Sequence, residues 1–212
     1  MKRLTLIIAV LLTGIVAGCK QKYTSEWTDK QAPETFEARF ETTKGDFTVR
    51  FTRDWSPMAV DRVYQLIKSD FYTDIAVFRV APGYVAQFGI SNDSLQNNYW
   101  NGRPFIDEPV KKQNVQKTVA FARAGPQTRG TQLFINLSDN SPRLDTLQYM
   151  KVSGFPVIGE VTEGWETVTA FYDKYGNEPS AVQDSITKRG NAFLRENYPE
   201  LDYIKKVKVV GK

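Results

Sequence analysis

Apolar and polar residues alternate in two neighbouring runs near the start of the regular part of the chain. The runs Phe36–Thr42 and Phe47–Phe51 place an apolar side chain at every second position, and Lys44-Gly45 lies between them. A period of two puts the apolar side chains on one face of a strand, and a glycine-containing break between two such runs is typical of a hairpin. We therefore predict a β-hairpin at the beginning of a sheet.

Three other stretches favour helices. Ser56-Pro57 predicts a helix start, with the serine as N-cap and the proline at the first helical position. The apolar side chains that follow have helical spacing, and they are Val60, Val63, Tyr64, Leu66 and Ile67. A second helix is predicted from Trp165, Val168, Phe171 and Tyr172. Pro179–Glu196 is only partly periodic, and we expect it to form an additional helix outside the sheet, with no function indicated.

Two polar stretches are expected to be loops on the surface. Ser91–Gln116 is predicted to be a long surface excursion, and residues 136–154 are loop-like. Asp107 and Glu108 lie in the first of these stretches. Because neighbouring side chains diverge on either a helix or a strand, we interpret this pair as solvated surface charge and not as a catalytic carboxylate pair.

Two strand–turn–strand segments carry the polar groups of greatest chemical interest. Phe78–Gln87 places Arg79 at the end of an apolar run, ahead of a turn at Pro82-Gly83. Thr118–Leu137 has the same design, with a glycine-containing turn at residues 124–130. We expect these two segments to form the walls of one groove.

The same two segments resemble those of a known family. Arg-Val-Ala-Pro-Gly-Tyr-Val-Ala-Gln, which starts at Arg79, resembles the Arg-Val-Ile-Pro-Gly-Phe-Met-x-Gln run of cyclophilin-type peptidyl-prolyl isomerases. Ala-Arg-Ala-Gly-Pro-Gln-Thr-Arg-Gly-Thr-Gln-Leu-Phe-Ile, which starts at Ala122, is similar to their Ala-Asn-Ala-Gly-Pro-Asn-Thr-Asn-Gly-Ser-Gln-Phe-Phe-Ile. The resemblance implies a mainly β fold over residues 35–212, namely a closed eight-stranded antiparallel barrel capped by two helices, with Tyr203–Val210 as its last strand. The extra C-terminal helix would be an addition to it.

The resemblance also implies a catalytic residue and a peptide groove. Arg79 would hold the proline carbonyl and offer an N–H to the nitrogen of the twisted amide. Gln87 would orient Arg79, since a buried amide needs partners, and the Ala122-Arg123 backbone would pair with bound peptide. The full set of substrate-binding candidates is Tyr84, Val85, Gln87, Ala122, Arg123, Gln132, Phe134, Leu144 and Phe155.

Several positions depart from the family pattern. Val77 replaces a usual phenylalanine and Phe78 a usual histidine, while Arg143 stands where many members have an aromatic residue. Phe155 aligns with a family histidine across an insertion of several residues. We therefore expect an altered pocket that retains activity.

The composition excludes several other chemistries. The chain has no histidine and one cysteine, so Ser-His-Asp and Cys-His catalysis and every histidine-containing zinc site are excluded. Prolyl isomerisation needs no acid, base, metal or cofactor, and we predict none. Two alternatives remain open: a non-catalytic chaperone or assembly factor that binds proline-containing segments, and a structural envelope protein with a vestigial groove.

The N-terminus has the pattern of a bacterial lipoprotein. Lys2 and Arg3 precede the apolar run Leu4–Val16, and small residues lead to Cys19, the only cysteine. We expect residues 1–18 to be a signal peptide, Cys19 to be lipidated, and residues 19–34 to form a tether in the cell envelope, facing the periplasm or the exterior. The alternative is an ordinary cleaved signal with a chance cysteine.

Net charge bears on the choice of partner. The formal charge is +4, with basic and acidic residues interspersed along the chain. A modest surplus of this kind argues against nucleic acid as a target. We expect a monomer that acts on proline-containing polypeptides and reaches the membrane through its lipid anchor.

Overall fold

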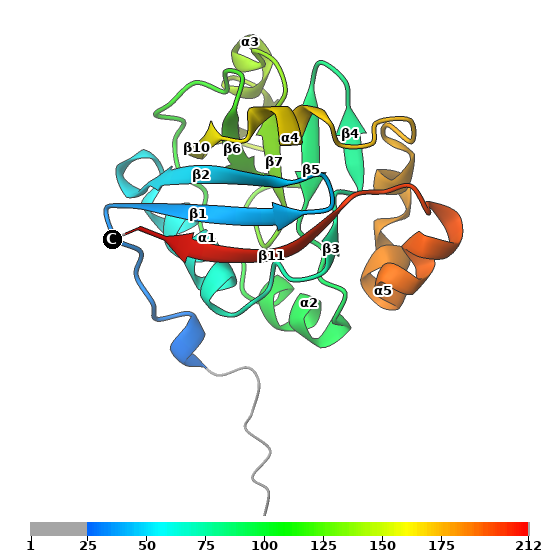
Figure 1. Ribbon diagram of the computed structural model, residues 1–212. Coiled ribbons are helices and arrows are strands. Elements are labelled where there is room, and N and C mark those ends of the chain that lie inside the picture. The colour runs from blue at the N-terminus through cyan, green and yellow to red at the C-terminus, as the bar shows by residue number, and fades with distance from the viewer. Residues whose placement is uncertain (1–24, 212) are drawn as a thin grey trace, which may run out of the picture.

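A curled antiparallel sheet forms the framework of the protein, shown in Figure 1 as a computed structural model that describes residues 25–211. The strands of this sheet are β1 (Thr35–Thr42), β2 (Asp46–Thr52), β3 (Ile75–Ala76), β4 (Arg79–Ala81), β5 (Val85–Phe88), β6 (Thr118–Phe121), β7 (Leu133–Asn136), β10 (Val157–Glu163) and β11 (Tyr203–Val210). A separate two-stranded hairpin consists of β8 (Gln148–Tyr149) and β9 (Val152–Ser153).

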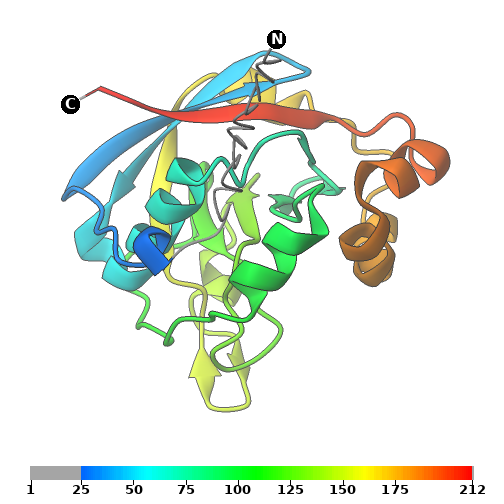
Figure 2. The same ribbon diagram turned by 90° about the horizontal axis from the view of Figure 1, so that it is seen from below.

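Helices cover the ends and one side of this sheet (Figures 1 and 2). They are α1 (Pro57–Lys68), α2 (Ser94–Asn101), α3 (Ser141–Leu144), α4 (Trp165–Thr169) and α5 (Gln183–Asn197). Three short 3-10 helices complete the described chain, namely η1 (Ser25–Trp27), η2 (Arg53–Trp55) and η3 (Glu178–Val182).

The strand order corrects the prediction of a closed eight-stranded barrel. The sheet has nine strands in the order β3-β11-β1-β2-β10-β6-β7-β5-β4, and all pairings are antiparallel. Within the described chain, the end strands β3 and β4 are not paired with each other. β3 and β4 are consecutive in the chain and very short, and they lie at opposite ends of the strand order. The curled sheet is therefore a half-barrel with two open edges.

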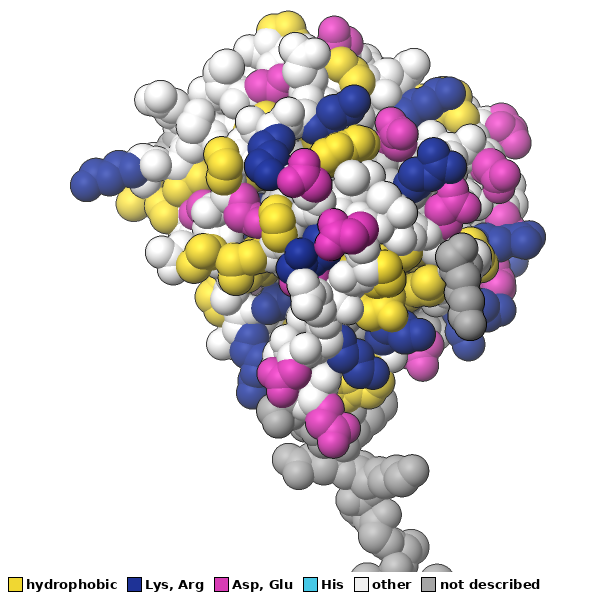
Figure 3. All heavy atoms as spheres, turned by 90° about the vertical axis from the view of Figure 1, so that its left-hand side faces the viewer, with side chains coloured by type: hydrophobic (Ala, Val, Ile, Leu, Met, Phe, Trp, Pro, Cys, Tyr) yellow, Lys and Arg dark blue, Asp and Glu magenta, His cyan; other side chains and the backbone are white. Residues whose placement is uncertain are grey.

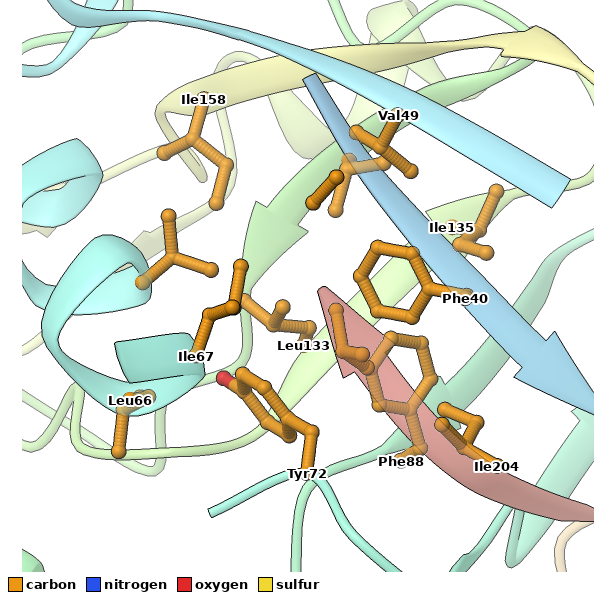
Figure 4. Close-up of a cluster of buried hydrophobic side chains, with 14 of the residues drawn as sticks. Phe40, Val49, Leu66, Ile67, Tyr72, Phe88, Leu133, Ile135, Ile158 and Ile204 are labelled. Carbon is orange, nitrogen blue, oxygen red and sulfur yellow. The ribbon is translucent and has the colours of Figure 1, made fainter. Parts of the chain in front are cut away.

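The predicted first hairpin is confirmed, and it carries much of the core. In the β1–β2 pair Phe40 lies opposite Phe47, and their rings stack with centroids 4.6 Å apart. Inside the curl, buried side chains from the sheet and from α1 pack together, as Figure 4 shows. They include Phe40, Val49, Leu66, Ile67, Tyr72, Phe88, Leu133, Ile135, Ile158 and Ile204. Burial of these apolar side chains away from water is the main contribution that stabilises the fold.

Helix α1 begins where the sequence predicts, but a carboxylate from elsewhere caps it. The Ser56 side chain makes no capping bond to the helix and donates instead to Oε2 of Glu108 at 2.5 Å. Glu108 also accepts from the backbone N–H groups of Met58 at 2.8 Å and Ala59 at 3.1 Å. A negative group at a helix N-terminus satisfies unpaired donors and complements the helix dipole.

The interpretation of Asp107 and Glu108 as solvated surface charge was therefore wrong for this pair. Their side chains are only 20% and 10% exposed, and both form ion pairs with the fully buried guanidinium of Arg129. The Arg129 guanidinium also lies 4.5 Å from the centre of the Phe105 ring. Both carboxylates thus contact Arg129 in the loop before β7, and Glu108 also binds the start of helix α1.

The two stretches predicted to be loops contain regular structure. The region from residue 91 to 116 includes helix α2, and Trp100 within it is fully buried. Residues 136–154 include α3 and the β8–β9 hairpin, which projects from the molecule in Figure 2. Their polar composition suggested surface loops, but a few apolar side chains suffice to dock each segment.

The additional C-terminal helix is confirmed as α5 and lies beside α2 (Figure 2). It is interrupted at Gly190, where φ is 58°, and a Cβ there would lie 2.4 Å from Oδ1 of Asn92. Both the left-handed backbone and this close approach require glycine. The second predicted helix is also present, but it ends at Thr169, so Phe171 and Tyr172 lie beyond α4.

Part of the expected tether lies against the domain. The Gln65 side chain donates to the carbonyls of Thr28 and Lys30, each at 2.9 Å, and the Ala32 N–H donates to Asp61 at 2.9 Å. The predicted signal peptide and Cys19 lie outside the described residues. Within residues 25–211, no helix is long and apolar enough to cross a bilayer.

Surface charge is mixed on the face shown in Figure 3, where basic and acidic side chains intersperse. An exposed cross-strand pair also joins Arg50 to Glu37 at 2.9 Å. Such exposed pairs add little stability.

The capping role of Glu108 predicts a large effect of its removal. Glu108→Ala would leave the Ser56 hydroxyl, two helix N–H groups and the Arg129 cation without this acceptor. We expect the free energy of unfolding of the full chain to fall by about 2–3 kcal/mol in urea titrations.

The matched control is Asp54→Ala, because this carboxylate is 82% exposed in its pair with Lys111. It should change stability by less than about 0.5 kcal/mol. Equal effects of the two substitutions would contradict the assignment of Glu108 as the cap of α1.

Candidate functional site

The β4–β5 hairpin places Arg79 directly opposite Gln87. The turn between the strands is closed by a hydrogen bond from the Tyr84 N–H to the Ala81 carbonyl at 2.9 Å, and Gly83 has φ of 68°. A positive φ at this turn position favours glycine. The Pro-Gly turn thus sets the register that brings the guanidinium and the amide to the same face of the sheet.

Strand β7 brings the apolar part of the site next to this pair. Phe134 lies opposite Gln87 in the β5–β7 pairing. It forms a small separate cluster with Val85, Ala120 and Leu144, against which Tyr84, Ala122 and Phe155 pack. Phe134 and Phe155 meet edge to face with ring centroids 5.6 Å apart. The outer face of the sheet therefore carries its own apolar surface.

A pocket of about 250 Å³ lies over this surface. It is lined by Arg79, Tyr84, Val85, Gln87, Ala122, Arg123, Phe134, Leu144, Phe155, Ser180 and Gln183. The structure thus brings together nine of the ten residues that the sequence pointed to. The tenth, Gln132, lines an adjoining pocket of about 170 Å³ that shares Gln87, Ala122, Arg123 and Gln183 with the first.

Arg79 is half-buried and held by two acceptors. Its Nε donates to Oδ1 of Asn177 at 2.6 Å, and its Nη1 donates to Oε1 of Gln87 at 3.0 Å. Burial lowers the pKa of Arg79, and the nearby Tyr84 partly offsets this effect. The guanidinium carbon lies 5.5 Å from the centre of the Tyr84 ring. Two hydrogen bonds and one ring thus fix the plane of the guanidinium.

Gln87 and Gln132 are joined in a chain of amides. Nε2 of Gln87 donates to Oε1 of Gln132 at 2.8 Å, and Nε2 of Gln132 donates to Oε1 of Gln183 at 2.8 Å. The predicted orienting role of Gln87 is consistent with its bond to Arg79. Sequence reasoning missed Asn177, Ser180 and Gln183, because the segment that holds them has no motif and was given no function.

Arg123 lines both pockets and reaches the base of the β8–β9 hairpin. Its guanidinium donates to the carbonyls of Gly154 at 3.0 Å, Leu147 at 3.3 Å and Val152 at 3.4 Å. It also lies 4.7 Å from the centre of the Phe155 ring. Arg123 therefore fixes the base of the hairpin at the rim of the site.

The backbone expected to pair with peptide is already partly used. The Ala122 N–H donates to the Gln132 carbonyl at 2.9 Å, which extends the β6–β7 pairing by one bond. Added-strand pairing along this segment would have to use its other backbone groups. The guanidinium carbon of the exposed Arg143 lies 5.6 Å from the centre of the Tyr84 ring, so a second cation contacts this pocket residue.

The site has the composition of a binding pocket whose two cations, Arg79 and Arg123, are both held by hydrogen bonds. Neither pocket lining contains an aspartate or a glutamate. Across residues 25–211, no group of three or more histidine, cysteine, aspartate or glutamate side chains could hold a metal ion. Oriented N–H donors beside apolar walls can hold a carbonyl and a small apolar ring.

Comparisons with known proteins agree with this arrangement. Residues 37–190 match the family model described as cyclophilin type peptidyl-prolyl cis-trans isomerase/CLD. The human protein named peptidyl-prolyl cis-trans isomerase-like 3 is 30% identical over 128 residues, which is 58% of this chain and 74% of that protein. A Neurospora crassa protein of the same name is 33% identical over 114 residues, 50% of this chain and 68% of that protein.

The fold comparison extends over more of the chain. The crystal structure of a Cryptosporidium parvum cyclophilin type peptidyl-prolyl cis-trans isomerase, in the presence of the dipeptide Ala-Pro, aligns with a TM-score of 0.60 at 18% identity. The alignment covers 83% of this chain and 99% of that one. The curled sheet, the Arg-Val-x-Pro-Gly hairpin and the family match agree, and the chain belongs to the cyclophilin-type peptidyl-prolyl cis-trans isomerases.

Proposed function

We propose that this protein isomerises X-Pro bonds by stabilising the twisted amide with Arg79, and that it does so for polypeptides of the cell envelope. The observation that carries the catalytic part is the position of the Arg79 guanidinium. It lies at the edge of the pocket lined by Phe134, fixed in orientation by Asn177 and Gln87.

The reaction requires little more than such a group. Rotation about an X-Pro bond faces a barrier of about 20 kcal/mol, which amide resonance sets. In the twisted state the proline nitrogen loses conjugation, becomes pyramidal and acquires a lone pair that can accept a hydrogen bond. A site that binds this state more tightly than either planar isomer lowers the barrier.

Arg79 has N–H groups that can bind the twisted amide, because its contacts with Asn177 and Gln87 do not use all five. A guanidinium has five N–H groups, and two of them are used for Asn177 and Gln87. Both N–H groups of Nη2 and one of Nη1 have no partner among the described residues. These donors can bind the proline carbonyl and the pyramidal nitrogen, while the proline ring contacts Phe134 and Leu144. The Ala-Pro dipeptide present with the related Cryptosporidium protein supports a ligand of this size.

Replacement of Arg79 tests the mechanism. Arg79→Ala should lower kcat/KM for cis/trans relaxation of an X-Pro test peptide by roughly 100-fold to 1000-fold, as expected for loss of an oriented donor. Arg79→Lys should recover only a small part, since an ammonium lacks the planar fork. Arg50→Ala is the matched control, because Arg50 is exposed on the sheet and pairs with Glu37.

Three outcomes of this experiment would contradict all or part of the proposal. A wild-type chain that binds X-Pro peptides without speeding their relaxation would select the non-catalytic chaperone. A wild-type chain that neither binds nor catalyses would select the structural protein with a vestigial groove. An Arg79→Ala variant with wild-type activity would exclude the arginine mechanism alone.

The absence of acidic side chains from the pocket linings predicts a simple pH profile. Arginine is charged below its pKa, and burial lowers the pKa of Arg79, so any loss of charge occurs as pH rises and never as pH falls. We expect kcat/KM to be constant from about pH 6 to pH 9, well below the ordinary range of an arginine pKa. An acid limb with a midpoint near pH 6 to 7, measured with a peptide free of titrating side chains, would require a group that the site does not contain.

The envelope location rests on the lipoprotein pattern that ends at Cys19. Two acyl chains or more bind a membrane stably, whereas one is marginal. We expect the full chain to fractionate with membranes and to incorporate labelled fatty acid when it is produced in bacteria, and Cys19→Ser to abolish both. The control Ser25→Ala should leave both unchanged. Incorporation that persists in the Cys19→Ser variant would contradict lipidation at this residue.

A further inference from the structure

A chain of hydrogen bonds through the site begins and ends in the segment 177–183. It runs from Asn177 through Arg79 and Gln87 to Gln132 and Gln183. Two further bonds within the segment connect Gln183 back to Asn177 through Ser180, which closes the circuit. Nε2 of Gln183 donates to the Ser180 carbonyl at 3.2 Å, and the Ser180 N–H donates to the Asn177 carbonyl at 3.1 Å.

The directions of the bonds between the glutamine side chains follow from Arg79. Because a guanidinium has donors only, Gln87 must turn its oxygen toward Arg79 and its NH₂ group toward Gln132. Gln132 must then present its oxygen to Gln87 and its NH₂ group to Gln183. The NH₂ group of Gln132 has this hydrogen bond only if Gln183 presents its side-chain oxygen as the acceptor. A change at residue 183 can therefore release the amides that orient the arginine.

The segment that completes the circuit is itself held by a separate apolar cluster. Helix α5, which follows η3, contributes Ile186 and Leu194 to this cluster. On the sheet side the cluster contains Ala76 and Phe78, which is only 1% exposed. Phe78 is the residue before Arg79 and replaces a histidine that is usual in the family. The apolar residue at this position is explained by the cover that α5 provides.

Polar bonds hold α5 at its middle, directly after the break at Gly190. The Asn191 side chain donates to the Asp74 carbonyl at 2.8 Å, and the Asn191 backbone N–H donates to Oδ1 of Asn92 at 2.8 Å. Asn191 is buried, so these bonds are costly to lose. Helix α5 is therefore held by polar bonds as well as by the apolar cluster, and Ser180 in η3 and Gln183 at the start of α5 line the pocket.

We propose that the segment 177–183 is part of the active site, with Asn177 and Gln183 as positioning residues that hold the Arg79 guanidinium in its catalytic orientation. Gln183 acts through Gln132 and Gln87, and Asn177 acts directly on Nε. The inference deepens the proposed isomerase function and rests on it for its kinetic consequence. The orientation of Arg79 can be measured independently of catalysis.

The kinetic test compares three variants of the full chain. Gln183→Leu removes the acceptor for Gln132, and we expect kcat to fall roughly 3-fold to 10-fold with KM changed less than about twofold, the effect of one net hydrogen bond. Gln183→Glu keeps the acceptor and should stay within about twofold of wild type. Gln113→Leu makes the same chemical change at an exposed position outside both pockets and serves as the control.

A spectroscopic test follows the Arg79 Nε–H directly. In a ¹H–¹⁵N spectrum of arginine side chains, the resonance that Arg79→Lys removes should shift in Gln183→Leu and remain in place in Gln183→Glu and Gln113→Leu. Asn177→Ala should shift it further, and Asn177→Asp, which keeps an acceptor, should preserve a hydrogen-bonded resonance. This second pair decides the question if Gln183→Leu does not fold.

The results can distinguish failure of the positioning role of Gln183 from failure of the isomerase function. If the wild-type chain catalyses isomerisation and Gln183→Leu leaves both kcat and the Arg79 resonance unchanged, the positioning role is wrong and the isomerase function stands. Equal loss of kcat in Gln183→Leu and Gln183→Glu would also contradict the positioning role, since the loss would then not depend on the acceptor at residue 183. If the wild-type chain is inactive, the function fails, and the resonance alone reports whether the circuit holds Arg79.

Discussion

A guanidinium has five donors and no acceptor, and the site is built around this asymmetry. Arg79 is half-buried, so the donors that face the protein must find oxygens there. Gln87 and Asn177 supply them from a strand and from a distant C-terminal segment. Each amide that turns its oxygen toward the arginine directs its own NH₂ group onward, which carries the requirement to Gln132 and Gln183. One cation thus orders the side chains of Gln87, Gln132 and Gln183.

The same requirement organises a second region behind the site. Arg129 is fully buried, and its charge is matched by Asp107 and Glu108. Glu108 also caps helix α1, so the loop before β7, the segment after α2 and the start of α1 are held by one cluster. Removal of Arg129 would leave two largely buried carboxylates without a counter-charge, which is far more costly than loss of an exposed pair.

Prolyl isomerisation tolerates much remodelling of its site because it uses neither proton transfer nor a covalent intermediate. An oriented set of donors beside an apolar wall suffices, and the surrounding residues can change if they preserve both. This chain replaces a family histidine with Phe78 and covers that residue with α5. It also adds Arg143 and the Arg123-bound hairpin at the rim. The departures from the family pattern therefore have packing partners in this molecule.

The sequence by itself determined the elements whose signals are local, because a strand alternation, an N-terminal Pro and a Pro-Gly turn act over a few residues. It predicted the first hairpin, helix α1, the C-terminal helix and, through the family resemblance, the residues around Arg79 that meet in the pocket. Only the tertiary structure decided the nine-stranded open sheet, the capping of α1 by Glu108, and the reach of Asn177 and Gln183 into the site. The contacts of Glu108 with α1, of Asn177 with Arg79 and of Gln183 with Gln132 join residues about 50 to 100 positions apart, and hydrogen bonds over such separations leave no periodic pattern in the chain.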